Sequence, residues 1–215
     1  MSGSPVTLWY AGYGSNTLDE RFRAYLDGSA TSSRFGAHPA HPAHLGGGAT
    51  GRTAWATCDH ALGFAGRSVR WDGAVAFLGL RPEAGAVSHL RLHELTASQL
   101  AHVATVENNV PDLGWDGDVG GLEVGGTHRF SLPAGLGPAR GKYDTVLRLP
   151  DHEGLPVVTL TTSRDLAGGS PGEAYRQVVA DGLAGSGLSR DEVAAYLDHA
   201  VARSACRPAS NRCSD

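Results

Sequence analysis

Cysteine, lysine and methionine are scarce in this chain of 215 residues, and long hydrophobic runs are missing. The three cysteines, Cys58, Cys206 and Cys213, cannot all pair with one another and show no Cys-x-x-Cys spacing. This excludes a disulfide framework and a thiolate zinc site. No run approaches the roughly 18–20 apolar residues that span a bilayer, and the N-terminus lacks a charged-then-apolar leader. We therefore expect a cytoplasmic protein with no membrane partner.

The charge balance is close to even. The chain has 18 basic and 22 acidic residues and a pI near 6.2. Because proteins that bind nucleic acid need a strongly basic surface, we expect no nucleic-acid partner. The hydrophobic content of 41% is sufficient for a sizeable core.

Helices and strands are predicted in alternation. Serine or threonine followed three positions later by Glu or Gln predicts four helix starts, at Thr17–Glu20, Thr96–Gln99, Ser170–Glu173 and Ser189–Glu192. Strand-like runs occupy 6–11, 73–80, 87–95, 142–149 and 155–162. Since no βαβ period repeats, the order favours a single domain of the mixed α/β (α+β) class over residues 1–202. Residues 203–215 are expected to form a flexible polar tail.

Two segments rich in glycine or proline, 27–52 and 111–141, predict loops. Each is interpreted as either a lid over a site or a solvated insertion. The first contains His38, His41 and His44, but the prolines between them oppose a helix that would align the three rings. We therefore expect no metal site, and a metal-dependent amide hydrolase is the alternative that this loop would support.

A glycine-rich turn follows the first predicted strand, where LWYAGYGSN leads into TLDERFRAYL. Glycines at 12 and 14, with a helix starting near Asn16 or Thr17, would leave backbone N–H groups pointing into the turn. Such a turn either binds an anion or a developing oxyanion, or is only a strand-to-helix connection. It lacks the glycines or lysine of the dinucleotide, P-loop and nucleophile-elbow motifs, so Ser15 is not predicted to be a nucleophile.

Glu107 is the candidate general base. In the helix opened by Thr96, it shares one face with Leu100, Val103 and Ala104 at i, i+3, i+4 and i+7. A carboxylate on the buried face of a helix suits proton transfer. The alternative is a frayed helix end that leaves Glu107 in water.

Four further residues could contribute to a site. His102 is offset from the Leu100 face, which predicts a surface histidine. His93 could face either side of its strand. Tyr143 and Asp144 could line a cavity, but a packed strand position for the tyrosine and a solvated edge charge for the aspartate are the favoured interpretation.

The turn and the glutamate together resemble the γ-glutamylcyclotransferase family. Tyr13 to Asn16 match the family's tyrosine-glycine-serine-asparagine turn, and Glu107 matches its catalytic glutamate at the end of a short helix. The sequence at 69–80 is similar to the family's tryptophan-glycine strand. The sequence at 170–188 resembles its closing segment, which supplies a pocket tyrosine, here Tyr175.

The resemblance implies a small mixed β-barrel flanked by α-helices, with a cavity at its mouth. It implies that Glu107 takes a proton from the α-ammonium of a γ-glutamyl group, whose amine attacks the γ-carbonyl and releases 5-oxoproline and an amine or amino acid. No cofactor is needed, because nucleophile and electrophile belong to one molecule. The implied substrate-binding residues are Tyr10, Gly12, Tyr13, Gly14, Ser15, Asn16 and Tyr175.

Other functions stay open at this point. The same pocket could serve an amide hydrolase or acyl transferase with a different substrate, or a non-catalytic module that binds a carboxylate. A buried Glu107 would disfavour the binding module, because its negative charge would repel the ligand. The leaving group is undetermined, and a homodimer is an open possibility.

Overall fold

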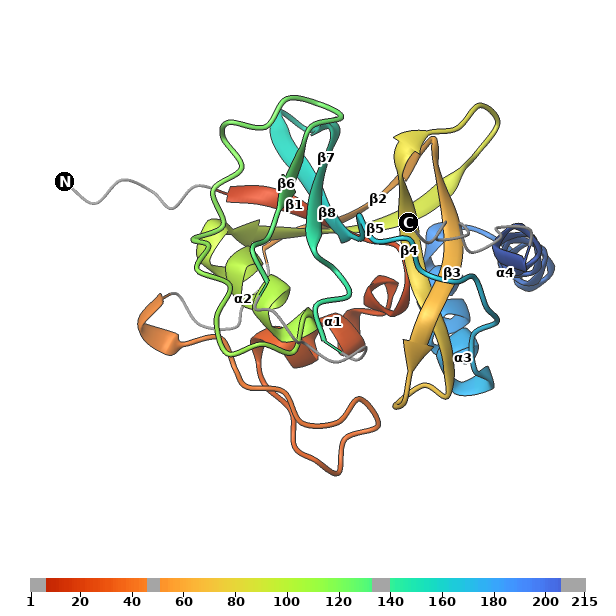
Figure 1. Cartoon of the computed structure of the whole chain (residues 1–215), viewed down its shortest axis with the longest axis horizontal. Helices are drawn as coiled ribbons and strands as arrows, with labels where there is room; N and C mark the ends of the chain where they lie inside the picture. The colour runs from red at the N-terminus through yellow and green to blue at the C-terminus, as the bar shows by residue number, and fades with distance from the viewer. Residues whose placement is uncertain (1–6, 46–50, 133–139, 206–215) are drawn as a thin grey trace, which may run out of the picture.

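The computed structural model describes residues 7–45, 51–132 and 140–205. Figure 1 shows how strands and helices alternate along this part of the chain. The strands are β1 (Thr7–Gly12), β2 (Thr53–Cys58), β3 (His60–Ser68), β4 (Gly73–Pro82), β5 (Ser88–Thr96), β6 (Thr127–Arg129), β7 (Thr145–His152) and β8 (Leu155–Thr161). The α-helices are α1 (Asp19–Leu26), α2 (Ala97–Glu107), α3 (Glu173–Leu183) and α4 (Arg190–Ala205). Short 3-10 helices are η1 (Ser15–Thr17), η2 (Ala43–Leu45) and η3 (Ala184–Ser186).

The strands form a mixed six-stranded sheet and a separate two-stranded hairpin. The sheet has the order β2-β5-β1-β8-β7-β6, and β3 pairs with β4. Strand β1 is antiparallel to β5 and parallel to β8, with Trp9 opposite Val157. The mixed α/β class is therefore confirmed. The ladder of the described strands does not close into one barrel.

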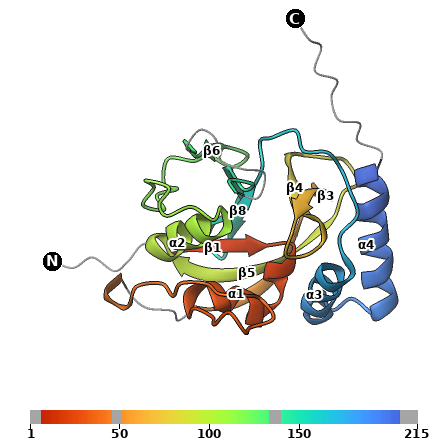
Figure 2. The ribbon, with the colours of Figure 1, turned by 60° about the horizontal axis from the view of Figure 1, so that its bottom comes forward.

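The central position of β1 explains its continuous apolar sequence. Successive side chains of a strand point to opposite faces, so Trp9 and Ala11 enter one core cluster while Leu8 and Tyr10 enter the other. The first cluster joins the sheet to the β3–β4 hairpin, α3 and α4. The second packs the sheet against α1 and α2. In Figure 2, α3 and α4 lie at the hairpin end of the molecule and α2 lies at the opposite end.

Two of the four predicted capping boxes are confirmed. Thr96 accepts from the Gln99 N–H while Gln99 accepts from the Thr96 N–H, and Ser189 and Glu192 pair in the same way. The box at Thr17 is wrong, because the Thr17 hydroxyl donates to the Gly14 carbonyl and Leu18 is the N-cap of α1. The box at Ser170 is also wrong, since α3 starts at Glu173 with Gly172 as its N-cap.

The five predicted strands correspond to β1, β4, β5, β7 and β8, whereas β2, β3 and β6 were missed. Residues 203–205 of the predicted tail belong to α4, and residues 206–215 lie outside the described residues. The 27–52 and 111–141 segments each lie partly outside them as well. Within the second segment, Val119 and Phe130 are buried in the core, so those residues are not a solvated insertion. None of the described helices is long and apolar enough to cross a membrane.

Candidate functional site

The turn after β1 is a tight 3-10 turn in which glycine is required twice. A Cβ atom on Gly12 would lie 2.7 Å from the carbonyl oxygen of Asn16. A Cβ atom on Gly14 would lie 2.8 Å from the hydroxyl of Tyr175. The backbone N–H and the hydroxyl of Thr17 both donate to the Gly14 carbonyl, at 3.0 and 2.8 Å. These contacts hold Ser15 and Asn16 buried at the end of the sheet.

Asn16 connects the turn to the end of helix α2. Its Nδ2 donates to Oε1 of Glu107 at 2.7 Å and to the hydroxyl of Tyr10 at 3.1 Å. Its Oδ1 is buried and has no hydrogen-bond partner among the described residues. The predicted turn and the predicted base therefore meet in space, although 91 positions separate Asn16 from Glu107. The hydrogen bond from Asn16 fixes one carboxylate oxygen of Glu107. The side chain is half-buried, and it lines a cavity.

A small cavity gathers the predicted site residues. Besides predicted residues, its lining includes Ala76 and Tyr143. Gly12 is the predicted residue that does not line this cavity; its missing side chain leaves room for the Asn16 backbone. The predicted residues in the lining are Tyr10, Tyr13, Gly14, Ser15, Asn16, Glu107 and Tyr175.

The phenols around this cavity are held in the neutral form. Burial is the main cause that raises the pKa of Tyr10, and the nearby Glu107 carboxylate raises it further. Burial likewise raises the pKa of Tyr175. The Tyr175 hydroxyl accepts from the Ala76 N–H at 3.2 Å, and the Tyr13 hydroxyl donates to the Leu160 carbonyl at 2.7 Å. The tyrosine walls of the small cavity are therefore uncharged, and contacts with the backbone position Tyr13 and Tyr175.

His93 supports the turn from behind. It is buried, its ring stacks on Phe22 with centroids 3.9 Å apart, and its Nε2 lies 3.0 Å from the Asn16 carbonyl oxygen. Burial lowers the pKa of His93 to about 4, so the imidazole is neutral at pH 7 and Nε2–H donates to that carbonyl. The sequence left the orientation of His93 open, and the structure gives it this supporting role.

A larger cavity of about 670 Å³ continues from the small one. Ser15, Glu107, Tyr143 and Tyr175 line both. Its outer walls come from Arg21 and Tyr25 of α1, residues 37–40 with Pro42, residues 68–71, the end of α2, and Lys142. Part of the predicted 27–52 loop therefore forms a wall of the cavity.

The histidine-rich loop has separate structural contacts. His38 Nε2 lies 3.0 Å from Nη1 of Arg21, and His41 Nε2 lies 3.1 Å from the Ser98 hydroxyl. His44 is exposed. Within residues 7–45, 51–132 and 140–205, no group of three or more His, Cys, Asp and Glu side chains could hold a metal ion.

Tyr143 combines the two roles that the sequence left open, while the interpretations of Asp144 and His102 need correction. Tyr143 lines both cavities while also packing on Phe77, with ring centroids 5.0 Å apart. Asp144 is buried and accepts from the Ser163 N–H and hydroxyl, both at 2.7 Å, so it is not a solvated edge charge. His102 is partly buried and its Nε2 lies 2.9 Å from the Tyr25 carbonyl oxygen, so it is not a free surface histidine.

Arg21 is a lining residue that the sequence interpretation missed. It stands four positions before Tyr25, and that spacing places both side chains on one face of α1. The guanidinium lies 4.2 Å from the centre of the Tyr25 ring. The i, i+4 spacing of an arginine and a tyrosine was the available signal.

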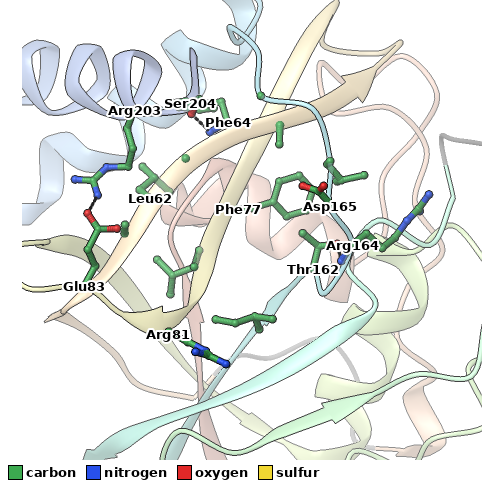
Figure 3. Close-up of a pocket in the computed structure, with 18 of the residues that line it drawn as sticks. Leu62, Phe64, Phe77, Arg81, Glu83, Thr162, Arg164, Asp165, Arg203 and Ser204 are labelled. Atoms are coloured by element: carbon green, nitrogen blue, oxygen red, sulfur yellow. Dashed lines mark hydrogen bonds and ion pairs between the residues drawn. The ribbon is translucent and has the colours of Figure 1, made fainter. Parts of the chain in front are cut away.

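A separate cavity of about 620 Å³ lies beside the β3–β4 hairpin. Figure 3 shows Leu62, Phe64 and Phe77 among its lining, with Arg203 of α4 paired to Glu83 across one side. Neither the glycine-rich turn nor Glu107 contributes to this cavity. The candidate active site is therefore the pair of connected cavities at Glu107.

Comparison with known proteins gives one relative in sequence and several in structure. No protein-family model matches the chain. Histone deacetylase 5 of Arabidopsis thaliana is 29% identical over 213 residues, and the match covers 92% of this chain. The chain spans 31% of the length of that relative.

The structural neighbours share the fold at low sequence identity. A γ-glutamyl cyclotransferase superposes with a TM-score of 0.51 and 15% identity, covering 88% of this chain and 86% of that one. A human protein described as uncharacterized superposes with a TM-score of 0.50 and 16% identity, over the same shares of the two chains. The fold that the turn and Glu107 predicted is confirmed: the chain has a γ-glutamylcyclotransferase-like fold.

Proposed function

We propose that the protein is a γ-glutamylcyclotransferase-like enzyme that cleaves a γ-glutamyl amide or peptide without a cofactor. The observation that supports this most strongly is the contact between Asn16 and Glu107, which fixes a carboxylate against the glycine-rich turn. A γ-glutamyl group contains an amine and an acyl carbon in one molecule. The site therefore needs only one proton-transfer group and one place to hold the carbonyl oxygen.

Glu107 acts as the general acid and base in this proposal. Its carboxylate takes a proton from the α-ammonium group of the substrate, and the free amine attacks the γ-carbonyl carbon. The new carbon–nitrogen bond closes the five-membered ring of 5-oxoproline. When the bond to the leaving nitrogen breaks, Glu107 gives its proton to that nitrogen, so an amine or amino acid departs. The freed carboxylate then takes the second proton of the former ammonium group from the ring nitrogen and passes it to water, which leaves the neutral ring amide of 5-oxoproline.

The turn from Tyr13 to Ser15 holds the reacting carbonyl. The first N–H groups of a 3-10 or α-helical turn have no acceptor within the turn, and they are suited to stabilise a developing oxyanion. The burial of Ser15 and Asn16 favours such contacts, because an electrostatic interaction is stronger away from water. Tyr10 and Tyr175, both neutral, complete the wall beside the glutamyl group.

A blocked substrate separates this reaction from hydrolysis. We expect a panel of γ-glutamyl dipeptides and amines to release their leaving amines, and the N-acetylated counterparts to stay intact, because acetylation removes the attacking amine. The released amine is measured by mass spectrometry. Equal cleavage of the free and acetylated compounds would instead indicate an amide hydrolase that uses water.

A further inference from the structure

The larger cavity has an excess of positive charge. Within the part of the chain that the structure describes, its ionic lining residues are three cations, Arg21, Arg70 and Lys142, and one carboxylate, Glu107. Burial and the two neighbouring arginines lower the pKa of His38 to about 4, so this histidine is neutral at pH 7. The cavity is therefore suited to a ligand that brings negative charge.

Arg21 is the most buried of these cations. It is 5% exposed, and no carboxylate within the described ranges forms an ion pair with it. Its Nε is buried without a hydrogen-bond partner among those residues. The Tyr25 ring and hydroxyl contact the guanidinium and offset part of the cost of burying it. A buried cation without an acidic partner is costly, and a bound anion would remove that cost.

Arg70 and Arg21 contact the same imidazole nitrogen of His38. Nη1 of Arg70 is 3.3 Å from His38 Nε2, and Nη1 of Arg21 is 3.0 Å from the same atom. Arg70 also donates to the Phe35 carbonyl, so its guanidinium is anchored although the residue is exposed. The two guanidiniums form a paired donor site at the wall of the cavity, and a carboxylate can accept from both.

This arginine pair is separate from the place assigned to the glutamyl group. Among the described residues, the lining of the small cavity at the turn includes Glu107 and no arginine, while Arg21 and Arg70 line the larger cavity only. Tyr25 connects the arginine pair to Glu107, since its hydroxyl accepts a hydrogen bond from Arg21 and also interacts with the Glu107 carboxylate. With the glutamyl group at the turn, the leaving part of the substrate extends toward the arginines.

We propose that Arg21 and Arg70 bind a carboxylate on the leaving part of the substrate. The preferred leaving group is then an amino acid or peptide with a free carboxylate, and a neutral amine is a poor one. This inference rests on the proposed cyclotransferase function and adds the substrate class to it.

The test compares γ-glutamyl-alanine with its C-terminal amide, in which a neutral amide of similar shape replaces the carboxylate. We expect the parent protein to have a kcat/KM about 10–100-fold higher for the acid, the usual contribution of hydrogen bonds to a charged group. Arg70→Gln should lower kcat/KM for the acid about 10-fold and leave the amide unchanged. The matched control is Arg81→Gln, because Arg81 is also exposed but lines the separate cavity.

The outcomes distinguish a failure of this inference from a failure of the proposed function. Equal use of acid and amide by the parent would overturn the inference and leave the cyclotransferase function standing. An equal loss on both substrates in Arg70→Gln, with an unchanged melting temperature, would place the guanidinium against the glutamyl group and also overturn it. If the folded parent releases 5-oxoproline from neither compound nor from any other γ-glutamyl substrate, the proposed function fails, and the inference fails with it.

Discussion

Replacing Glu107 with glutamine should lower the rate of 5-oxoproline release by about 10²–10⁴-fold, the usual contribution of a general acid or base. Glutamine has the same shape and still offers an oxygen to Nδ2 of Asn16, but it cannot take the proton from the substrate ammonium. The loss should therefore appear in kcat and in kcat/KM. Initial rates measured by mass spectrometry on the best substrate of the panel provide the comparison.

Glu123→Gln is the matched control for this substitution. Glu123 is exposed and lines neither the small nor the larger cavity. The Glu123→Gln substitution removes the same negative charge away from the site, so the variant should release 5-oxoproline at the rate of the parent. Because the Asn16 contact survives in Glu107→Gln, the melting temperatures of all three proteins should agree closely. A Glu107→Gln protein that is folded and as active as the parent would refute the role of this carboxylate.

Gly12→Ala should damage both stability and activity. The added Cβ would lie 2.7 Å from the carbonyl oxygen and 2.8 Å from the carbonyl carbon of Asn16, and a backbone cannot rotate away as a flexible side chain can. Overpacking of this kind costs about 1–3 kcal/mol. For a chain of this size, each kcal/mol lowers the melting temperature by about 2–4 °C. Since Asn16 positions Glu107, we also expect kcat to fall by up to about 10²-fold.

Gly121→Ala is the control for this glycine substitution. Gly121 is exposed and has nothing within 4 Å of its added Cβ. Its φ is not in the positive range that disfavours alanine. Thermal unfolding and the 5-oxoproline assay should give parental values for Gly121→Ala and reduced values for Gly12→Ala. Parental values for both would show that the turn tolerates a Cβ and does not depend on glycine.

The parts of the fold that were predictable depend on local patterns. The capping box at Thr96 and the spacing of Leu100, Val103 and Glu107 are set within one helix, and the structure reproduces the helix start. The place of Glu107 at the helix end, which the family resemblance implied, is also observed. The box at Thr17 failed because its hydroxyl donates to the Gly14 carbonyl three residues earlier, within the 3-10 turn, and α1 begins only after Leu18. This local bond from a side chain to the backbone competes with the cap.

The strands and site contacts that the sequence did not predict depend on residues far apart in the chain. Strand β2 has no buried residue, and in β3 the buried Leu62 and Phe64 alternate with small alanine and glycine residues. The local signal of both strands is therefore weak, and their pairing with β5 and β4 is decided by long-range contacts. Asp144 was misjudged because its partner Ser163 is 19 positions away. The hydrogen bond between Asn16 and Glu107 could likewise not be predicted without the fold, although each of the two residues was identified separately.

The most direct test of the proposed function is the identity of the acyl product formed in water enriched in ¹⁸O. The parent protein and a γ-glutamyl dipeptide are incubated, and the products are analysed by mass spectrometry. The proposed mechanism predicts 5-oxoproline without ¹⁸O, because the attacking atom is the substrate's own nitrogen. Free glutamate that contains ¹⁸O would mean that water attacks the γ-carbonyl, and it would contradict the cyclotransferase function.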